Sequence, residues 1–303
     1  MILTIGNINV DLICQVPRLP TPDDKVIVSN LSIVPGGGAC NFAVGLSRLG
    51  SKVALFGHVG NDQNGKAGLE SLQAENVDIS NVVIEEKIPT GFVIILVDKN
   101  GQTIKIGYRE ANALLSPSDI TKRLLKGVTL VHVSSVSAEV AFKVAEICNV
   151  MGIEGSIDFG GELMNQSQEV LLKIVDSFSI VFMNKIAFEK TFNVAPNEQG
   201  LKIAQSRDIG ILNVTKGDQG SYLVTRKDIL KIPIWNVPVI DTTGAGDAYA
   251  AGFIHYFQEG LSLYEIGKKA AACAALQITL SNARDGMPMR EDVDEFIKNS
   301  VKK

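Results

Sequence analysis

The feature that most constrains the fold of this chain is the alternation of short β-branched runs with helical patterns. Apolar runs of strand length occupy residues 2–5, 52–59, 130–133, 155–158, 180–183 and 211–215. Segments with helical spacing occupy residues 41–49, 65–75, 138–151, 168–176 and 246–258. Because strands that alternate with helices usually pair in parallel, the sequence predicts an α/β fold with a parallel sheet covered by helices.

Two segments break this rhythm and predict a second, smaller sheet. Residues 10–34 are rich in proline and end in a strand-like stretch at 25–34. Residues 91–98 and 103–108 flank a Lys99-Asn100-Gly101 turn, which is typical of a hairpin. We expect these strands to form a lid inserted at about residues 12–34 and 90–109 of a single domain spanning 1–303. The alternative is that they extend the edge of the main sheet.

The composition argues against several classes of function. The 303 residues carry a net charge of −4 without a cluster of lysine or arginine, so no nucleic-acid partner is expected. Four widely spaced cysteines and three histidines form no motif for structural zinc and are typical of a reduced, cytoplasmic protein. No apolar run approaches the ~20 residues that a membrane span needs, so we expect neither a membrane partner nor a recognisable export signal.

The strongest chemical signal is the stretch at residues 241–247, which reads DTTGAGD and directly precedes a helical pattern. The small residues Gly244, Ala245 and Gly246 at a helix start leave backbone N–H groups free to hold an anion. Asp247 would lie beside that anion, where its carboxylate can take a proton from a substrate hydroxyl. Taken alone, the stretch is also explained by a glycine-rich loop whose aspartate complements the helix dipole.

Other nucleotide-binding motifs are absent from the sequence. The chain has no GxxxxGK[ST] loop and no GxGxxG near its first strand, which argues against P-loop enzymes and Rossmann dehydrogenases. Asp158, Phe159 and Gly160 spell the DFG triplet of protein kinases, but the companion HRD and VAIK motifs are missing. We therefore interpret the triplet as a coincidence.

A series of motifs along nearly the whole chain resembles the PfkB (ribokinase-like) carbohydrate and nucleoside kinases. The matching segments are residues 6–11, 35–50, 57–65, 214–220, 241–247 and 271–288. The resemblance implies a three-layer α/β/α domain with a mostly parallel central sheet and a small β-sheet lid. It also implies transfer of the γ-phosphate of ATP to a hydroxyl, with Asp247 as the base and the N–H groups of Gly244, Ala245 and Gly246 around the transferred group.

The remaining site residues follow from the resemblance by position. The substrate would be bound by Asn9, Asp11, Gly37, Gly38 and Asn41. ATP would be bound by Asn184, Thr215, Lys216, Gly217, Gly220, Ala271 and Ala275. Asn9 and Asp11 also lie just past the first predicted strand, where an amide and a carboxylate suit a polyol, although a turn asparagine and a loop-capping aspartate explain them equally.

The resemblance also implies two metal ions. A monovalent cation, K⁺, would be bound by Asp241, Thr243 and backbone oxygens between residues 280 and 286. Mg²⁺ is positioned in the family by an N-x-x-E motif, of which this chain keeps Asn184 but has Ala187 in place of the glutamate. Because Mg²⁺ usually takes few direct protein ligands, we hypothesise a higher Mg²⁺ requirement and not a loss of activity.

The choice of substrate depends on the predicted lid. Phe92, Ile94 and Leu96 share one face of the hairpin, and we expect Phe92 to bind a nucleobase. The alternative is that this face forms the small core of the lid itself. Arg109, after Tyr108, resembles the arginine that binds the carboxylate in 2-keto-3-deoxygluconate kinases. We predict a nucleoside kinase acting on the ribose 5′-hydroxyl, with a ribose, fructose or sugar-acid kinase as the alternative and an inactive ligand sensor as a remote one. The apolar stretch 92–97 further predicts a homodimer through the lid.

Overall fold

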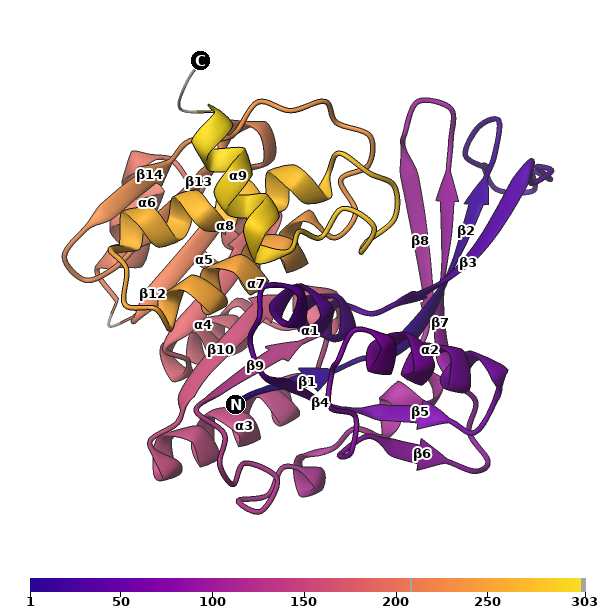
Figure 1. The fold of residues 1–303 in the computed structure, drawn as a ribbon, viewed down its shortest axis with the longest axis horizontal. Coiled ribbons are helices and arrows are strands. Elements are labelled where there is room, and N and C mark those ends of the chain that lie inside the picture. The colour runs from indigo at the N-terminus through magenta and orange to yellow at the C-terminus, as the bar shows by residue number, and fades with distance from the viewer. Residues whose placement is uncertain (208, 301–303) are drawn as a thin grey trace.

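The computed structural model describes residues 1–207 and 209–300, and its centre is an eight-stranded sheet (Figure 1). The strands in spatial order are β14 (Ile229–Ile232), β13 (Ser221–Val224), β12 (Ile211–Thr215), β11 (Ile180–Asn184), β10 (Glu154–Phe159), β9 (Leu130–Ser134), β1 (Ile2–Gly6) and β4 (Val53–Phe56). All neighbours from β4 to β12 pair in parallel, and only the pairings of β12 with β13 and of β13 with β14 are antiparallel. The predicted mostly parallel α/β sheet is therefore confirmed.

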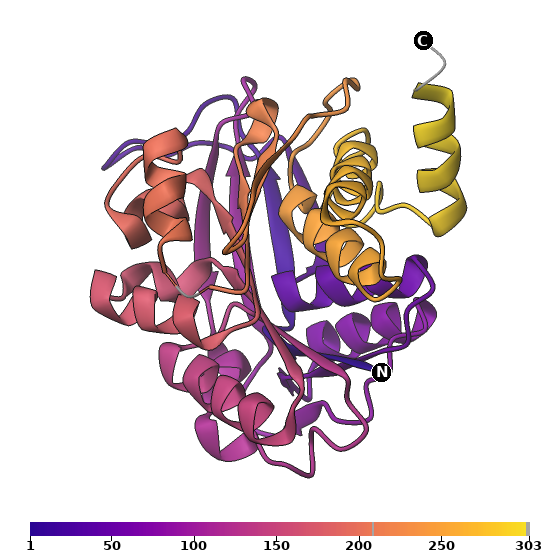
Figure 2. The same cartoon turned by 90° about the vertical axis from the view of Figure 1, so that its left-hand side faces the viewer.

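Helices cover both faces of this sheet and make three layers, which Figure 2 shows nearly edge-on. One face carries α3 (Ala138–Met151), α4 (Gln168–Ser177), α5 (Lys185–Phe192) and α6 (Glu198–Gln205). The other carries α1 (Gly38–Arg48), α2 (Gln63–Ala74), α7 (Ala245–Phe257), α8 (Leu263–Gln277) and α9 (Arg290–Ser300). Strand β1 supplies both cores, because Leu3 and Ile5 pack into one apolar cluster and Ile2 into the other.

Shorter elements complete the description. A small parallel pair consists of β5 (His58–Gly60) and β6 (Val83–Glu85). The 3₁₀ segments in the described part of the chain are η1 (Glu110–Leu114), η2 (Pro117–Asp119), η3 (Gly161–Asn165) and η4 (Gly217–Gln219). No helix among the described residues is long and apolar enough to cross a membrane.

The second sheet stands apart from the first, as Figure 1 shows at its right-hand side. Its strand order is β3 (Asn30–Gly36), β2 (Asn9–Gln15), β7 (Gly91–Val97) and β8 (Thr103–Tyr108). Strands β2 and β7 pair in parallel and the outer pairs are antiparallel, so this lid is a mixed sheet. None of these strands pairs with the main sheet within the described chain, so the alternative of an edge extension is wrong.

The sequence patterns missed several elements. The run at 52–59 is two strands, because β4 ends at Phe56 and the chain turns at Gly57 into β5. The apolar periodicity did not predict α5, α6 and α9, in which only a narrow stripe of residues is apolar and buried. It also did not predict the edge strands β13 and β14. Strand β3 begins at Asn30, five residues later than the predicted start at 25.

Candidate active site

A cavity of about 440 Å³ lies between the lid and the carboxyl ends of the central strands. This is the edge at which open α/β sheets bind their ligands. Its lining consists of Asn7, Asn9, Asp11, Gly37, Gly38, Asn41, Val93, Ile95, Lys105, Arg109, Ser135, Gly161, Glu162, Thr243, Gly244 and Asp247. The structure thus gathers residues from both ends of the chain into one site.

Helix α7 begins at the floor of this cavity. Its N-cap, Gly244, has φ +78°, and a Cβ at that position would lie 2.3 Å from the carbonyl oxygen of Ala283. Only glycine allows this close approach, which leaves the first N–H groups of α7 without a side-chain cap. The Ala245 N–H donates to the Thr242 carbonyl at 3.3 Å, and the other donors of this turn form, with the helix dipole, an anion site that opens beside Asp247.

Asp247 lies in the first turn of α7, half-buried at the cavity. Burial raises its pKa to about 6, against the lowering effects of Asn41, Arg284 and Lys105. A carboxylate with this pKa is mostly ionised at neutral pH and still accepts a proton readily. The residue is therefore suited to act as a general base.

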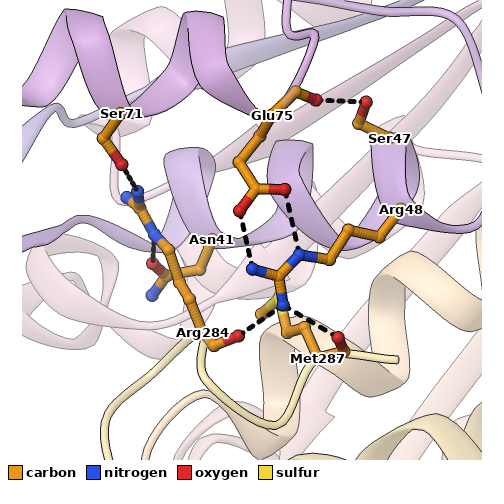
Figure 3. A network of polar contacts seen from close by, with 7 residues as sticks. All are labelled: Asn41, Ser47, Arg48, Ser71, Glu75, Arg284 and Met287. Carbon is orange, nitrogen blue, oxygen red and sulfur yellow. Dashed lines mark hydrogen bonds and ion pairs between the residues drawn. The ribbon is translucent and has the colours of Figure 1, made fainter. Parts of the chain in front are cut away.

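Asn41 lines the cavity, as expected for a substrate-binding residue, and its side chain also bonds Asp247. Its Nδ2 donates to Asp247 Oδ2 at 2.9 Å, and its Oδ1 accepts from Arg284 Nε at 2.8 Å. Arg284, only 9% exposed, also donates to Ser71 Oγ at 3.3 Å and to the Gly36 carbonyl at 3.2 Å. In Figure 3 the Arg284 guanidinium lies between Ser71 and Asn41. Arg284 therefore fixes the amide orientation that Asp247 requires.

Arg48 connects α1 with the end of α2 and with the loop after α8. Arg48, at the end of α1, pairs with Glu75 beyond α2 at 2.6 Å and donates to the carbonyls of Arg284 and Met287 at 2.7 and 2.9 Å. Figure 3 shows this fork, in which one guanidinium reaches both the carboxylate and the loop after α8. The loop that carries Arg284 is thereby held against α1.

Asp11 and Asn9 lie side by side on β2 at the lid end of the cavity. Burial raises the pKa of Asp11, against the lowering effects of Lys105 and Arg284. Asn9 Oδ1 accepts from Asn112 Nδ2 at 2.7 Å, and Asn112 also bonds the backbone of Ile8. Asn112 is buried in η1. The sequence did not single it out, because only the folded chain shows that it contacts Asn9.

Gly37 and Gly38 border the cavity as expected. Gly37 is the N-cap of α1 with φ +98°. A Cβ on Gly38 would lie 2.7 Å from Ser134 Oγ and 3.5 Å from Asp247 Oδ1, so any side chain there would fill the space in front of the Asp247 carboxylate. The absence of a side chain at Gly38 keeps this space open for an acceptor.

The expectation for Phe92 is corrected by the register of the lid. Residues that pair across β2, β7 and β8 share a face, and Asp11, Val93 and Gly107 form one such row. Val93, Ile95 and Lys105 consequently face the cavity. Phe92 lies on the outer face and packs edge-on against Tyr108, with the two ring centroids 5.5 Å apart. The sequence pattern identified the alternation correctly but not which of the two faces meets the site.

Arg109 reaches the cavity rim but is already engaged. Its guanidinium pairs with Glu162 and donates to the Asn112 carbonyl at 3.3 Å. Lys105, on the adjacent strand, makes no hydrogen bond with a described residue, and its charge acts on both Asp11 and Asp247. Lys105 was not singled out from the sequence, because only the strand register shows that it faces inward.

The residues expected to bind ATP follow one edge of the sheet and do not line the acceptor cavity. Asn184 and Thr215 pair at the ends of β11 and β12, and Gly217 and Gly220 form the next turn, both with positive φ. Lys216 points elsewhere, since its ammonium donates to the Pro196 carbonyl at 3.2 Å and lies over the Tyr222 ring. In α8, Ala275 is buried and Ala271 is half-buried.

The first turn of α5 offers little for Mg²⁺. Asn184 caps this helix through Oδ1, which accepts from the Ala187 N–H at 2.8 Å. Ala187 is 1% exposed and packs in the core, so no carboxylate projects from this turn. No cluster of three metal-binding side chains exists within the described residues.

Asp158 is a further carboxyl group near the site, and burial together with the neighbouring Asp247 raises its pKa to about 7.

The residues expected to hold K⁺ are already bonded to protein groups. Asp241 accepts from the N–H of Thr243 at 2.8 Å and from that of Asn282 at 3.0 Å. The Thr243 carbonyl accepts from Gln277 Nε2 at 3.0 Å. A cation next to this carbonyl would meet an N–H donor, so the donor set as arranged does not fit K⁺.

Comparison with known proteins places this geometry in context. The model of the pfkB family of carbohydrate kinases matches residues 1–290. An ATP-dependent ribose-1-phosphate kinase of Halopiger xanaduensis is 28% identical over 296 residues, covering 98% of this chain and 97% of that protein. A nucleoside kinase of Methanocaldococcus jannaschii is 28% identical over 301 residues, covering 98% and 96%.

Solved structures agree with the fold. The crystal structure of the M. jannaschii nucleoside kinase superposes with a TM-score of 0.85 and covers 98% of both chains. An Arabidopsis thaliana ribokinase, solved with ribose and ATP, superposes with a TM-score of 0.87 at 24% identity and covers 98% of both chains. The arrangement of a mostly parallel central sheet and a four-stranded lid is therefore ribokinase-like.

Proposed function

The chain belongs to the pfkB family of carbohydrate kinases and is a phosphotransferase with an alcohol acceptor, and from this premise we propose that it transfers the γ-phosphate of ATP to the primary hydroxyl of a ribofuranose substituted at C1. The observation that carries the proposal is the position of Asp247 beside the open N-terminus of α7, facing Asp11 and Asn9 across the cavity. The remote alternative, an inactive ligand sensor, is set aside because this base and the α7 amide groups are both in place.

The proposed reaction assigns one role to each part of the site. Asp247 takes the proton of the hydroxyl as its oxygen forms a bond to the γ-phosphorus, and the bond from that phosphorus to the β–γ bridging oxygen breaks. The N–H groups at residues 244–246 stabilise the charge on the transferred group, and ADP leaves. Asn41 and Arg284 keep the accepting oxygen of Asp247 aimed at the cavity.

Kinases of this family use ATP together with Mg²⁺. When bound, the ion neutralises charge on the phosphates, and we propose that it does so here mainly through phosphate oxygens and water, since Ala187 contributes no carboxylate. The edge formed by Asn184, Thr215, Gly217 and Gly220 would take the nucleotide. A higher Mg²⁺ requirement than in relatives with a glutamate at this position remains part of the proposal.

We propose that the acceptor carries a group at C1 because the lid lines the cavity with an apolar wall and with a positive charge, in addition to Asp11. Val93 and Ile95 form an apolar wall that suits a nucleobase, so a nucleoside is the first candidate. Lys105 supplies a positive charge that suits a C1 phosphate, so ribose 1-phosphate is the second. Relatives with about the same identity act on each.

A substrate panel with one matched variant pair tests this proposal. ADP release is measured with inosine, guanosine, cytidine, ribose 1-phosphate, ribose, fructose and 2-keto-3-deoxygluconate. A C1-substituted ribose should have a kcat/KM at least about 100-fold higher than that of free ribose. Free ribose would leave the part of the cavity beside the lid unfilled and its polar groups unpaired. Preferential phosphorylation of fructose or the sugar acid would overturn the proposal.

Lys105→Met separates the two candidates. If ribose 1-phosphate is the acceptor, its kcat/KM should fall by about 10-fold or more, since a charge-assisted contact is lost. If a nucleoside is the acceptor, its kcat/KM should fall only through the effect of the lost charge on Asp11 and Asp247, so the ratio of kcat/KM for the nucleoside to that for ribose 1-phosphate should not decrease. Lys122→Met, at an exposed lysine outside the cavity, is the control for loss of a surface charge.

The outer face of the lid supports a proposed homodimer. Leu31, Ile33, Ile106 and Tyr108 are 52%, 60%, 55% and 56% exposed, and the register places Ile33 and Ile106 in one row with Ile94 between them. Exposed apolar patches of this kind are typical of protein interfaces.

We also propose a cytoplasmic location, where ATP is abundant and the four buried, unpaired cysteines would stay reduced.

A further inference from the structure

Gln277, the last residue of α8, is fully buried, and its side chain lies between two loops of the site. Its Nε2 donates to the Thr243 carbonyl at 3.0 Å and to the Asn282 carbonyl at 2.7 Å. Its Oε1 has no partner among the described residues. A buried glutamine that uses both N–H bonds and leaves its oxygen unpaired is positioned by its donors alone.

The two carbonyls belong to the segments that shape the anion site. Thr243 directly precedes Gly244, the N-cap of α7, and Asn282 directly precedes Ala283, on whose carbonyl Gly244 packs. Asp241 joins the same segments from the other side, by accepting from the N–H groups of Thr243 and Asn282. The Gln277 amide supplies positive partial charge and the Asp241 carboxylate negative charge to one cross-link.

We propose that the Gln277 side-chain amide replaces a monovalent cation in this chain, so that the anion site is held in its active form without K⁺. The two amide hydrogens bond the carbonyl oxygens that would otherwise be left facing a cation. A cation at this place would have to displace those hydrogens and lose its own hydration, whereas the amide is supplied by the fold. Gln277 is thus a positioning residue, which acts through Thr243 on the N-terminus of α7.

The orientation of the Gln277 amide decides whether the site can hold a cation. Turning the side-chain amide by half a turn would present Oε1 to a cation, but it would also direct both N–H groups away from their acceptors. The carbonyls of Thr243 and Asn282 would then lose their donor, and only a tightly bound cation would compensate for both lost hydrogen bonds. The observed orientation is the one that needs no ion.

The first test compares monovalent cations in the original protein. Activity and thermal unfolding are measured in tetramethylammonium chloride and again with added KCl at equal ionic strength. The kcat/KM should change by less than about 2-fold, and the melting temperature should stay the same, because K⁺ has no differential affinity for the folded state. Activation by K⁺ of about 10-fold or more, or stabilisation by K⁺, would overturn the proposal.

Two variants test the site itself. In Gln277→Ala the carbonyls of Thr243 and Asn282 lose their donor, so activity in tetramethylammonium should fall by about 10-fold or more and K⁺ should restore most of it. In Gln277→Met a side chain of similar volume fills the space, so activity should fall without rescue by K⁺. Equal rescue of both variants, or of neither, would contradict the replacement.

A measurement without turnover separates this inference from the proposed function, on which it rests only through the anion site. Crystals of the original protein and of Gln277→Ala are soaked in RbCl, and the anomalous signal of Rb⁺ is measured between residues 243 and 282. A peak is expected in the variant alone. A peak in the original protein would refute the inference whatever the acceptor proves to be.

Discussion

At the scale of single residues, the proposed chemistry depends on how the half-buried Asp247 carboxylate is kept both basic and oriented. Asp247 would be a weaker base without burial, which raises its pKa, and a poorly ionised one without Asn41 and Arg284, which lower it. The balance is a pKa of about 6. Arg284 was not predicted from the sequence, because it lies in a loop 37 positions after Asp247 and carries no recognisable motif.

This balance predicts the pH dependence of the reaction. Because Asp247 must be ionised to accept a proton, kcat/KM should rise with pH through an ionisation near pH 6 and level off above it. Arg284 lowers the pKa, so Arg284→Met should move this acid limb to higher pH. The measurement is kcat/KM from pH 5 to 9, with the exposed Arg123→Met as the control. An unchanged limb in Arg284→Met would show that Arg284 does not act on the base.

At the scale of elements, the lid explains both a successful and a failed prediction. Turn chemistry and alternation were enough to find β7 and β8, because Lys99-Asn100-Gly101 is a strong hairpin signal. They could not say which face of the hairpin meets the site, since alternation is the same for both faces. That choice is set by the parallel pairing of β7 with β2, whose Asp11 must point into the cavity.

The outer face of the lid carries the prediction about assembly. Placing a charge in the middle of this face, in Ile33→Asp or Ile106→Asp, should convert a dimer into monomers because an unpaired carboxylate would be buried in the interface. Mass measured by light scattering across a concentration series checks this, with Ile203→Asp, on exposed α6, as the matched control. A monomeric original protein, or a dimer that survives both lid variants, would contradict the lid interface.

At the scale of the whole molecule, the fold followed from the sequence more completely than the site did. The alternating pattern fixes a parallel α/β sheet because each βα unit must pack its helix back on the sheet. The site depends on contacts between distant segments, such as Asn41 with Asp247 and Gln277 with Thr243, for which local patterns carry no information. Motif order located the proposed base and the glycines, but only the folded chain showed which groups hold them.

The most direct test of this account is the Asp247→Asn variant, measured for turnover and for stability as pH changes. Loss of the base should lower kcat by about 10² to 10⁴-fold. Folding raises the pKa of Asp247 from 3.8 to about 6, so the original protein loses stability as pH rises through this range, whereas the neutral asparagine does not. The variant should therefore gain in unfolding free energy relative to the original protein between pH 4 and pH 7. A folded Asp247→Asn protein that turns over at the original rate would contradict the account.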